Sequence, residues 1–238
     1  MRYSIRSLVI LMIFMHGSVA VLSQTTSTQI WNEYMLNMPL GKKISMEGAL
    51  SYSTVLGQPK WRAFDVQFTP EFAVNKHVDI MAAALLSSTF QSESLSTLEI
   101  REMIGTRIHF TPDSRILTRL LLRFEQRNLE DKEAGSWDHS TRGRIRAEAL
   151  IPINARSMSH DKLWYIITDA ETFIVFDQDV QERFANRLRF RLGTGYRINY
   201  KFRIEFIYMM QRSKNTIGTD VESVDNVFRL RLKHYLRP

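Results

Sequence analysis

The sequence predicts an all-β protein, an antiparallel up-and-down transmembrane β-barrel of about ten strands. Apolar and polar residues alternate through most of the chain, with the period of two that is typical of strands covered on one side only. The charged residues of these segments keep to one face. Beyond the first residues, no run approaches the 18 consecutive apolar residues of a membrane-spanning helix.

Residues 1–23 are predicted to be a cleaved signal peptide. Two arginines precede the apolar run of residues 8–15, which is shorter than the about 20 residues of a spanning helix. Small residues place the cleavage site after Ala20 or after Ser23. We therefore expect an exported protein.

The composition excludes several classes of protein. An apolar content of 44% argues against disorder, and 10 Gly and 6 Pro in 238 residues argue against a collagen-like chain. The absence of cysteine excludes disulfides, Cys-ligated zinc, iron-sulfur clusters and lipid attachment through a thiol. We expect neither a cofactor nor a metal site.

The predicted barrel occupies residues 43–238. Its ten strands are expected at residues 43–52, 61–72, 78–90, 98–110, 116–127, 141–153, 163–176, 184–200, 202–211 and 226–235, joined alternately by short turns and by longer polar loops such as 129–140. Residues 24–42 form an N-terminal segment, a possible extra strand or an extension into the lumen or periplasm, because residues 29–37 also alternate. An eleventh strand conflicts with the even number usual in bacterial barrels, so we expect ten, with twelve as the alternative.

The main inference comes from the positions of the charged residues within each strand. The ten spans contain 29 charged residues, of which 27 share one parity within their strand, and Arg62 and Glu102 are the exceptions. A soluble barrel would turn this face outward, whereas a membrane barrel would turn it into the lumen. Of the 17 basic residues in phase, 15 are Arg, whose planar fork suits a confined interior that must satisfy several carboxylates. We therefore expect the charged face inside, with aromatic residues at the strand ends, namely Trp61, Phe64, Phe90, Phe110, Trp164, Phe184 and Tyr200, at the lipid interfaces.

Several runs also resemble a known family. They are residues 29–33 (QIWNE), 105–110 (GTRIHF), 123–128 (RFEQRN), 142–148 (RGRIRAE), 169–171 (DAE) and 183–189 (RFANRLR). They resemble an uncharacterised family of bacterial outer-membrane β-barrels, a domain of unknown function common among Bacteroidota, over nearly all of residues 29–236. The resemblance implies an outer-membrane location and supplies no activity. The chain departs from many outer-membrane barrels at its end, where Tyr235 is followed by three further residues.

A charged network is predicted to line the lumen. Its members are Arg107, Arg119, Arg123, Glu125, Arg127, Arg142, Arg144, Arg146, Glu148, Asp169, Glu171, Arg187, Arg189, Arg191, Glu205, Arg229 and Arg231. Hairpin symmetry places Glu171 by Arg189, Asp169 by Arg191, Glu125 by Arg144 and Glu205 by Arg231.

Three functions follow from these features. In the leading interpretation, ion pairs fill a narrow lumen and the barrel is a structural or loop-presenting protein. The first alternative is a narrow anion-favouring channel, because basic residues outnumber acidic ones on the charged face. The second is a soluble periplasmic barrel that carries lipid or another apolar ligand, if the apolar face lies inside.

Enzymatic and nucleic-acid functions are less well supported. His109 and the run Asp138-His139-Ser140 could pair a base with an acid, but no nucleophile elbow, metal-spaced His pair or phosphate loop accompanies them. The arginines form no helical stripe for nucleic acid. The expected partners are outer-membrane lipid and lipopolysaccharide, the latter through divalent cations on the acidic loops, and the barrel assembly machinery.

Overall fold

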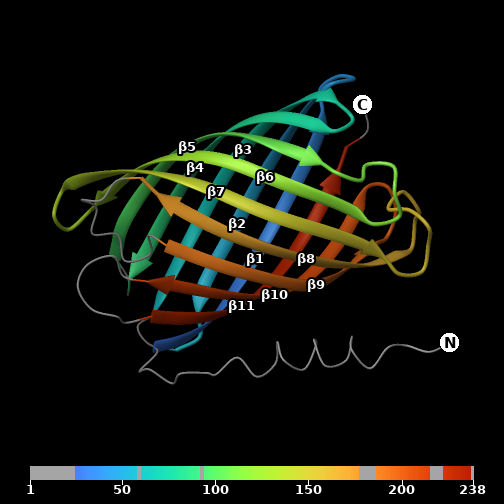
Figure 1. Ribbon diagram of the computed structural model, residues 1–238. Helices are drawn as coiled ribbons and strands as arrows, with labels where there is room; N and C mark the ends of the chain where they lie inside the picture. Colours follow the sequence, from blue (N-terminus) through green and yellow to red (C-terminus); the bar gives the residue numbers. More distant parts are fainter. Residues whose placement is uncertain (1–24, 58–59, 92–93, 177–185, 215–221, 237–238) are drawn as a thin grey trace, which may run out of the picture.

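The computed structural model describes residues 25–57, 60–91, 94–176, 186–214 and 222–236. These residues form a closed β-barrel of eleven strands without helices (Figure 1). The described residues include no helical segment with the length and hydropathy needed to cross a membrane. The all-β barrel prediction is therefore confirmed.

The strands are long, at 12 to 17 residues each. Their bounds are β1 Thr25–Pro39, β2 Ile44–Val55, β3 Trp61–Asn75, β4 Val78–Gln91, β5 Ser94–His109, β6 Leu117–Asp131, β7 Ser136–Pro152, β8 Leu163–Val175, β9 Asn186–Arg197, β10 Phe202–Lys214 and β11 Glu222–Tyr235.

Closure of the barrel corrects the expected strand number. Each strand pairs antiparallel with its sequence neighbour, and β1 pairs with β11 in parallel, from Thr25 opposite Ser223 to Asn37 opposite Tyr235. The segment 24–42, left open between a strand and an extension, thus provides a wall strand, and both ten and twelve were wrong. The parallel seam follows from the odd number, because the first and last of eleven alternating strands run in the same direction.

The seam gives the barrel two distinct rims. We call the rim where β11 ends the C-terminal rim, and its connections are residues 40–43, 76–77, 110–116, 153–162 and 198–201. The opposite N-terminal rim holds the start of β1. The expected contrast between short turns and long loops is wrong, because several predicted loop residues extend the strands instead.

The clearest case is the expected loop 129–140. β6 continues to Asp131 and β7 begins at Ser136, so the hairpin projects beyond its neighbours at the N-terminal rim (Figure 1). Its four-residue turn is closed by Gly135, which adopts the left-handed φ of 65° that glycine tolerates best. The Asp131 carboxylate accepts bonds from the backbone N–H groups of Glu133 and Ala134, and these bonds lower the pKa of Asp131.

The two faces of the wall differ as the alternation predicted. Large apolar side chains are exposed on the outside, with Ile104 61% and Leu192 60% exposed, whereas the Glu125 side chain inside is 0% exposed. The two out-of-phase residues, Arg62 and Glu102, are exposed on the outer face. A charged interior does not suit an apolar ligand, which argues against the lipid-carrier alternative.

An apolar cluster lies in the interior near the C-terminal rim. Leu163, Tyr165 and Ile167 of β8 are buried against Ile207 of β10, and Met158 from the connection 153–162 covers them. Arg197 donates to the Met158 carbonyl at 2.7 Å and holds the connection over the opening. The cluster therefore narrows one mouth of the barrel.

Candidate functional site

The interior wall is strongly asymmetric in charge. Along β2, β3 and β4, the inward positions are mostly small or acidic, and among the described residues none of them is Lys or Arg. The basic side chains come from β5 to β7 and β9 to β11. Arg107 of β5 reaches across β4 to bond both oxygens of Glu71 on β3, at 2.8 and 2.9 Å. Long arginines thus fill the space that the small residues leave.

Glu125 of β6 is the most enclosed carboxylate of this network. Arg123 and Arg142 each approach it to 2.7 Å, and Arg144 and Arg101 lie at 3.5 and 3.7 Å. Four guanidinium groups from three strands therefore share one carboxylate. A buried charge is tolerated when it is paired and hydrogen-bonded in this way.

Glu171 of β8 is a second centre. Arg144 donates to one of its oxygens, and Arg189 and Arg191 of β9 approach the other at 3.3 Å. Arg191 also donates to Asp169 at 2.6 Å. Because Arg144 contacts both Glu125 and Glu171, the two centres form one continuous network.

An aromatic ring supports the same arginines. The guanidinium carbons of Arg142, Arg144 and Arg189 lie 4.7, 5.3 and 4.9 Å from the centre of the Phe173 ring. A guanidinium over an aromatic face gains cation–π attraction. Phe173 therefore stabilises cations that outnumber the nearby carboxylates.

A third centre joins the two edges of the parallel seam. Glu33 of β1 bonds Arg229 and Arg231 of β11. Arg231 also donates to Glu205 of β10 at 2.9 Å, and Tyr165 of β8 donates to the same Glu205 at 2.7 Å. This chain of contacts ties β8, β10, β11 and β1 together at the point of closure.

The other members of the predicted network occupy the same face. Arg119 bonds Glu148 across β6 and β7, and Arg127 donates to Glu99 at 2.7 Å. Arg146 faces inward opposite Glu171 in register, and no hydrogen bond or ion pair to it is found among the described residues. The side chain of Arg187 lies outside the described residues.

The predicted register pairs largely hold. Glu171 is opposite Arg189, Asp169 is opposite Arg191, and Glu205 is opposite Arg231. Glu125 is opposite Arg142 rather than Arg144, because the turn after β6 is centred one residue earlier than expected. Glu33 was not among the predicted lumen residues, because residues 24–42 were not assigned to the wall; the alternation of Trp31 and Glu33 with Tyr34 and Leu36 carried that signal.

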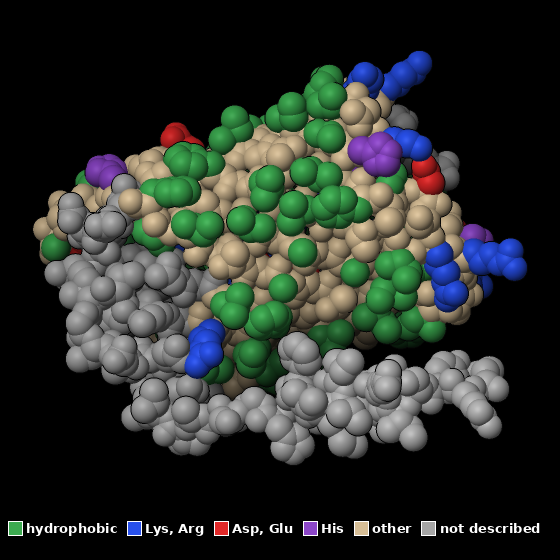
Figure 2. All heavy atoms as spheres, in the orientation of Figure 1, with side chains coloured by type: hydrophobic (Ala, Val, Ile, Leu, Met, Phe, Trp, Pro, Cys, Tyr) green, Lys and Arg blue, Asp and Glu red, His purple; other side chains and the backbone are tan. Residues whose placement is uncertain are grey.

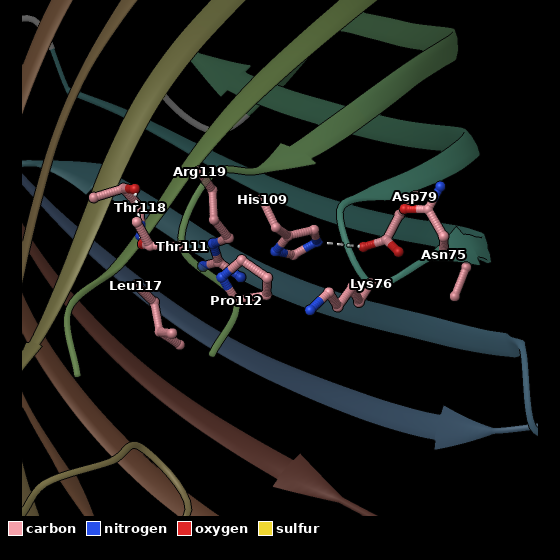
Figure 3. A pocket seen from close by; sticks show the side chains of 10 residues that line it. Asn75, Lys76, Asp79, His109, Thr111, Pro112, Leu117, Thr118 and Arg119 are labelled. Carbon is pink, nitrogen blue, oxygen red and sulfur yellow. Dashed lines mark hydrogen bonds and ion pairs between the residues drawn. The ribbon is translucent and has the colours of Figure 1, made fainter. Parts of the chain in front are cut away.

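A separate polar pocket lies at the C-terminal rim. It has a volume of about 380 Å³ and lies between the ends of β3, β4, β5 and β6 (Figure 3). Inside it, His109 Nε2 and Asp79 Oδ2 are 2.7 Å apart, and Figure 3 shows Arg119 and Pro112 on the other side of the imidazole ring. The Thr111 and Thr118 hydroxyls are hydrogen-bonded to each other at 2.9 Å. Such a pocket could orient a small polar molecule, but its acids and bases are already paired.

The other candidate catalytic run is not assembled into a site. Asp138, His139 and Ser140 lie on β7, where successive residues face opposite sides, and His139 Nδ1 contacts Asn128 outside the barrel at 2.7 Å while Ser140 is buried. Among the described residues, no group of three His, Asp or Glu side chains is arranged to hold a metal ion.

These features define a class: a closed mixed β-barrel with an apolar outer wall and an arginine-rich, ion-paired interior. The chain belongs to the family described as "Protein of unknown function (DUF2490)", whose model matches residues 28–222. No curated protein matches the chain. The match confirms a domain of unknown function over most of the chain, whereas the outer-membrane location and the bacterial group stay predictions.

Proposed function

We propose that this protein is an outer-membrane β-barrel that acts as a closed scaffold and presents the β6–β7 hairpin on one side of the membrane. The proposal combines an outer wall suited to lipid with an interior suited to permanent closure. Insertion by the barrel assembly machinery and contact with outer-membrane lipid belong to the same proposal.

The observation that carries the membrane location is the extensive apolar outer wall, which is interrupted by polar outward residues toward the N-terminal rim. On β5, β6 and β7, the residues Glu102, Gln126 and Thr141 are opposite one another in register and face outward. On the C-terminal side of this row the outer face is apolar, with Ile104 and Phe124 exposed. On the other side the outer face is mixed, because Asn128 and His139 of the projecting hairpin are polar whereas Ile100 and Trp137 are exposed and apolar. An apolar band, about 25 Å tall, is what a bilayer requires of a barrel.

Other strands also carry polar outward residues near the N-terminal rim. Arg62 of β3, Arg212 of β10 and Asn226 of β11 face outward there. Of the expected interface aromatics, Phe64, Phe110 and Trp164 are exposed on the outer face. Trp61 instead shares the inward parity of β3 with Ala63, and Phe184 lies outside the described residues. Polar outward residues on these strands, beside the apolar wall, support a transmembrane orientation over a soluble one.

The closed interior supports the scaffold interpretation. Glu125, Glu171, Arg142 and Arg191 are each 5% exposed or less, although they belong to the lumen. In a barrel of eleven strands, side chains of this length can fill the bore. An open channel would instead leave these groups in contact with water.

Two measurements test the proposal. The full-length protein is expected in the outer-membrane fraction, and it should migrate faster on a detergent gel before boiling than after. In planar bilayers the wild type is expected to give no steady conductance. Recovery in the soluble fraction would reject the membrane location, whereas steady anion-selective current would reject closure and favour the channel alternative.

A matched pair of variants sharpens the conductance test. Arg142→Ala removes a guanidinium that fills the interior, and Arg62→Ala removes one from the outer face. Only the first variant should produce measurable current. Equal behaviour of the two would argue against an interior closed by its arginines.

A further inference from the structure

A ring of basic residues surrounds the C-terminal rim. Every one of its five connections carries at least one exposed Lys or Arg: Lys42 and Lys43, Lys76, Arg115, Arg156 and Lys162, and Lys201. The same connections contain two acidic residues, Asp113 and Asp161. Figure 2 shows Lys and Arg side chains gathered at this end of the barrel, beside the apolar wall.

The ring is mostly unneutralised. Asp113 accepts from Lys76 at 2.7 Å, and Asp161 lies 3.4 Å from Arg197, a residue that points into the barrel. Among the described residues, the other six cations of the ring have no carboxylate within 4.0 Å. Their positive charge is therefore free to attract an anion from outside the protein.

The ring also lies at the edge of the apolar band. Lys43 is 5.9 Å from the centre of the Phe72 ring, and Lys201 is 5.7 Å from that of Tyr200. Exposed Leu40 and Phe110 lie at the same level of the outer wall. Cations beside aromatic and apolar side chains are typical of the level of lipid headgroups.

We propose that this ring binds the phosphates of anionic glycerophospholipid headgroups and so places the C-terminal rim in a phospholipid leaflet. Single cations spaced around the circumference match many separate headgroups, each with one phosphate diester. Lipid A carries its phosphates on one disaccharide and would need a dense basic patch. The inference rests on the proposed membrane location and adds to it the lipid class and the orientation.

The test compares two triple variants of the full-length protein in detergent. Lys42→Gln, Lys43→Gln and Lys201→Gln remove three charges from the ring. Lys60→Gln, Arg62→Gln and Lys132→Gln remove three exposed charges from the N-terminal rim. Native mass spectrometry measures binding of phosphatidylglycerol, with phosphatidylcholine as the neutral lipid and with lipid A and inorganic phosphate as competitors.

The ring variant is expected to bind phosphatidylglycerol about tenfold or more weakly than the wild type, since each basic residue near an anionic surface contributes about 1 kcal/mol. The N-terminal rim variant should bind as the wild type does. An equal loss of phosphatidylglycerol binding in both variants would show that only net charge matters and would overturn the inference. Unchanged binding by the ring variant would also overturn it. If lipid A displaced phosphatidylglycerol and competed more strongly than inorganic phosphate, the ring would belong in the leaflet that contains lipid A, and the phospholipid assignment would be overturned.

Fractionation of the cells that produce the wild type distinguishes failure of the ring assignment from failure of the proposed membrane location. If the wild type lies in the membrane fraction and the ring variant still binds phosphatidylglycerol normally, only the ring assignment fails. If the wild type itself is soluble, the membrane location fails first.

Discussion

At the scale of single residues, Gly195 decides how three strands meet. Tyr165 of β8 lies opposite Gly195 of β9 in register, and Gly195 lies opposite Glu205 of β10. Because Gly195 has no side chain, the Tyr165 ring crosses β9 and its hydroxyl donates to Glu205 at 2.7 Å. Glycine inside a strand often marks such a close approach.

Gly195→Ala should therefore destabilise the barrel by about 1–3 kcal/mol, the usual cost of overpacking, because its Cβ would overlap the buried Tyr165 ring. Gly48→Ala on β2 is the control, since its Cβ would lie 3.9 Å from Phe68, an ordinary contact. The temperature at which the compact gel band is lost measures both. A Gly195→Ala barrel as stable as Gly48→Ala would contradict this packing.

Glu125 makes a second prediction at this scale. Glu125→Leu would leave Arg101, Arg123, Arg142 and Arg144 without the carboxylate they share, and breaking a buried ion pair in this way costs about 3–5 kcal/mol. Glu102→Leu removes a carboxylate from the exposed outer face and should change stability by less than about 0.5 kcal/mol. Denaturant unfolding of both variants checks this, and a similar loss in each would speak against a hub at Glu125.

At the scale of elements, the parallel seam between β1 and β11 is the unusual feature. It predicts that Thr28 and Asn226 are neighbours near one rim while Leu36 and His234 are neighbours near the other. Since the chain has no cysteine, introduced cysteine pairs can be read without background.

The double variants Thr28→Cys with Asn226→Cys and Leu36→Cys with His234→Cys should both form disulfides on mild oxidation. Thr28→Cys with His234→Cys should not, because these residues lie at opposite ends of the seam. A shift in gel mobility under non-reducing conditions reports each bond. Cross-linking of the third pair alone would show an antiparallel seam instead.

At the scale of the whole molecule, the odd strand number places the start of β1 and the end of β11 at opposite rims. If the barrel spans the membrane, the hairpin residue Ala134 and the connection residue Leu56 face one side, whereas Gly41 and Ser114 face the other.

Single-cysteine variants at these four positions should therefore label as two pairs with a membrane-impermeant maleimide on intact cells. We expect Ala134→Cys and Leu56→Cys to react. Gly41→Cys and Ser114→Cys should react only after the cells are opened, because the proposed contact of the basic ring with phospholipid would turn the C-terminal rim toward the cell interior. Reaction of all four on intact cells would contradict a transmembrane barrel.

The sequence by itself determined the all-β class, the approximate strands and the inward face. The class and the strands depend on alternation along each strand, and the choice of the inward face on the preponderance of Arg among its cations; both are local properties of the chain. It also predicted three register pairs, because hairpin partners are fixed by the turn between them.

Only the tertiary structure decided how the barrel closes and which carboxylate serves which arginines. The partner of β1 is about 200 residues away along the chain, so no turn specifies it. Likewise, the contacts of Arg144 with both Glu125 and Glu171 depend on the reach of long side chains across neighbouring strands. Alternation assigns a face to each residue, whereas curvature and closure of the sheet determine which residues meet inside it.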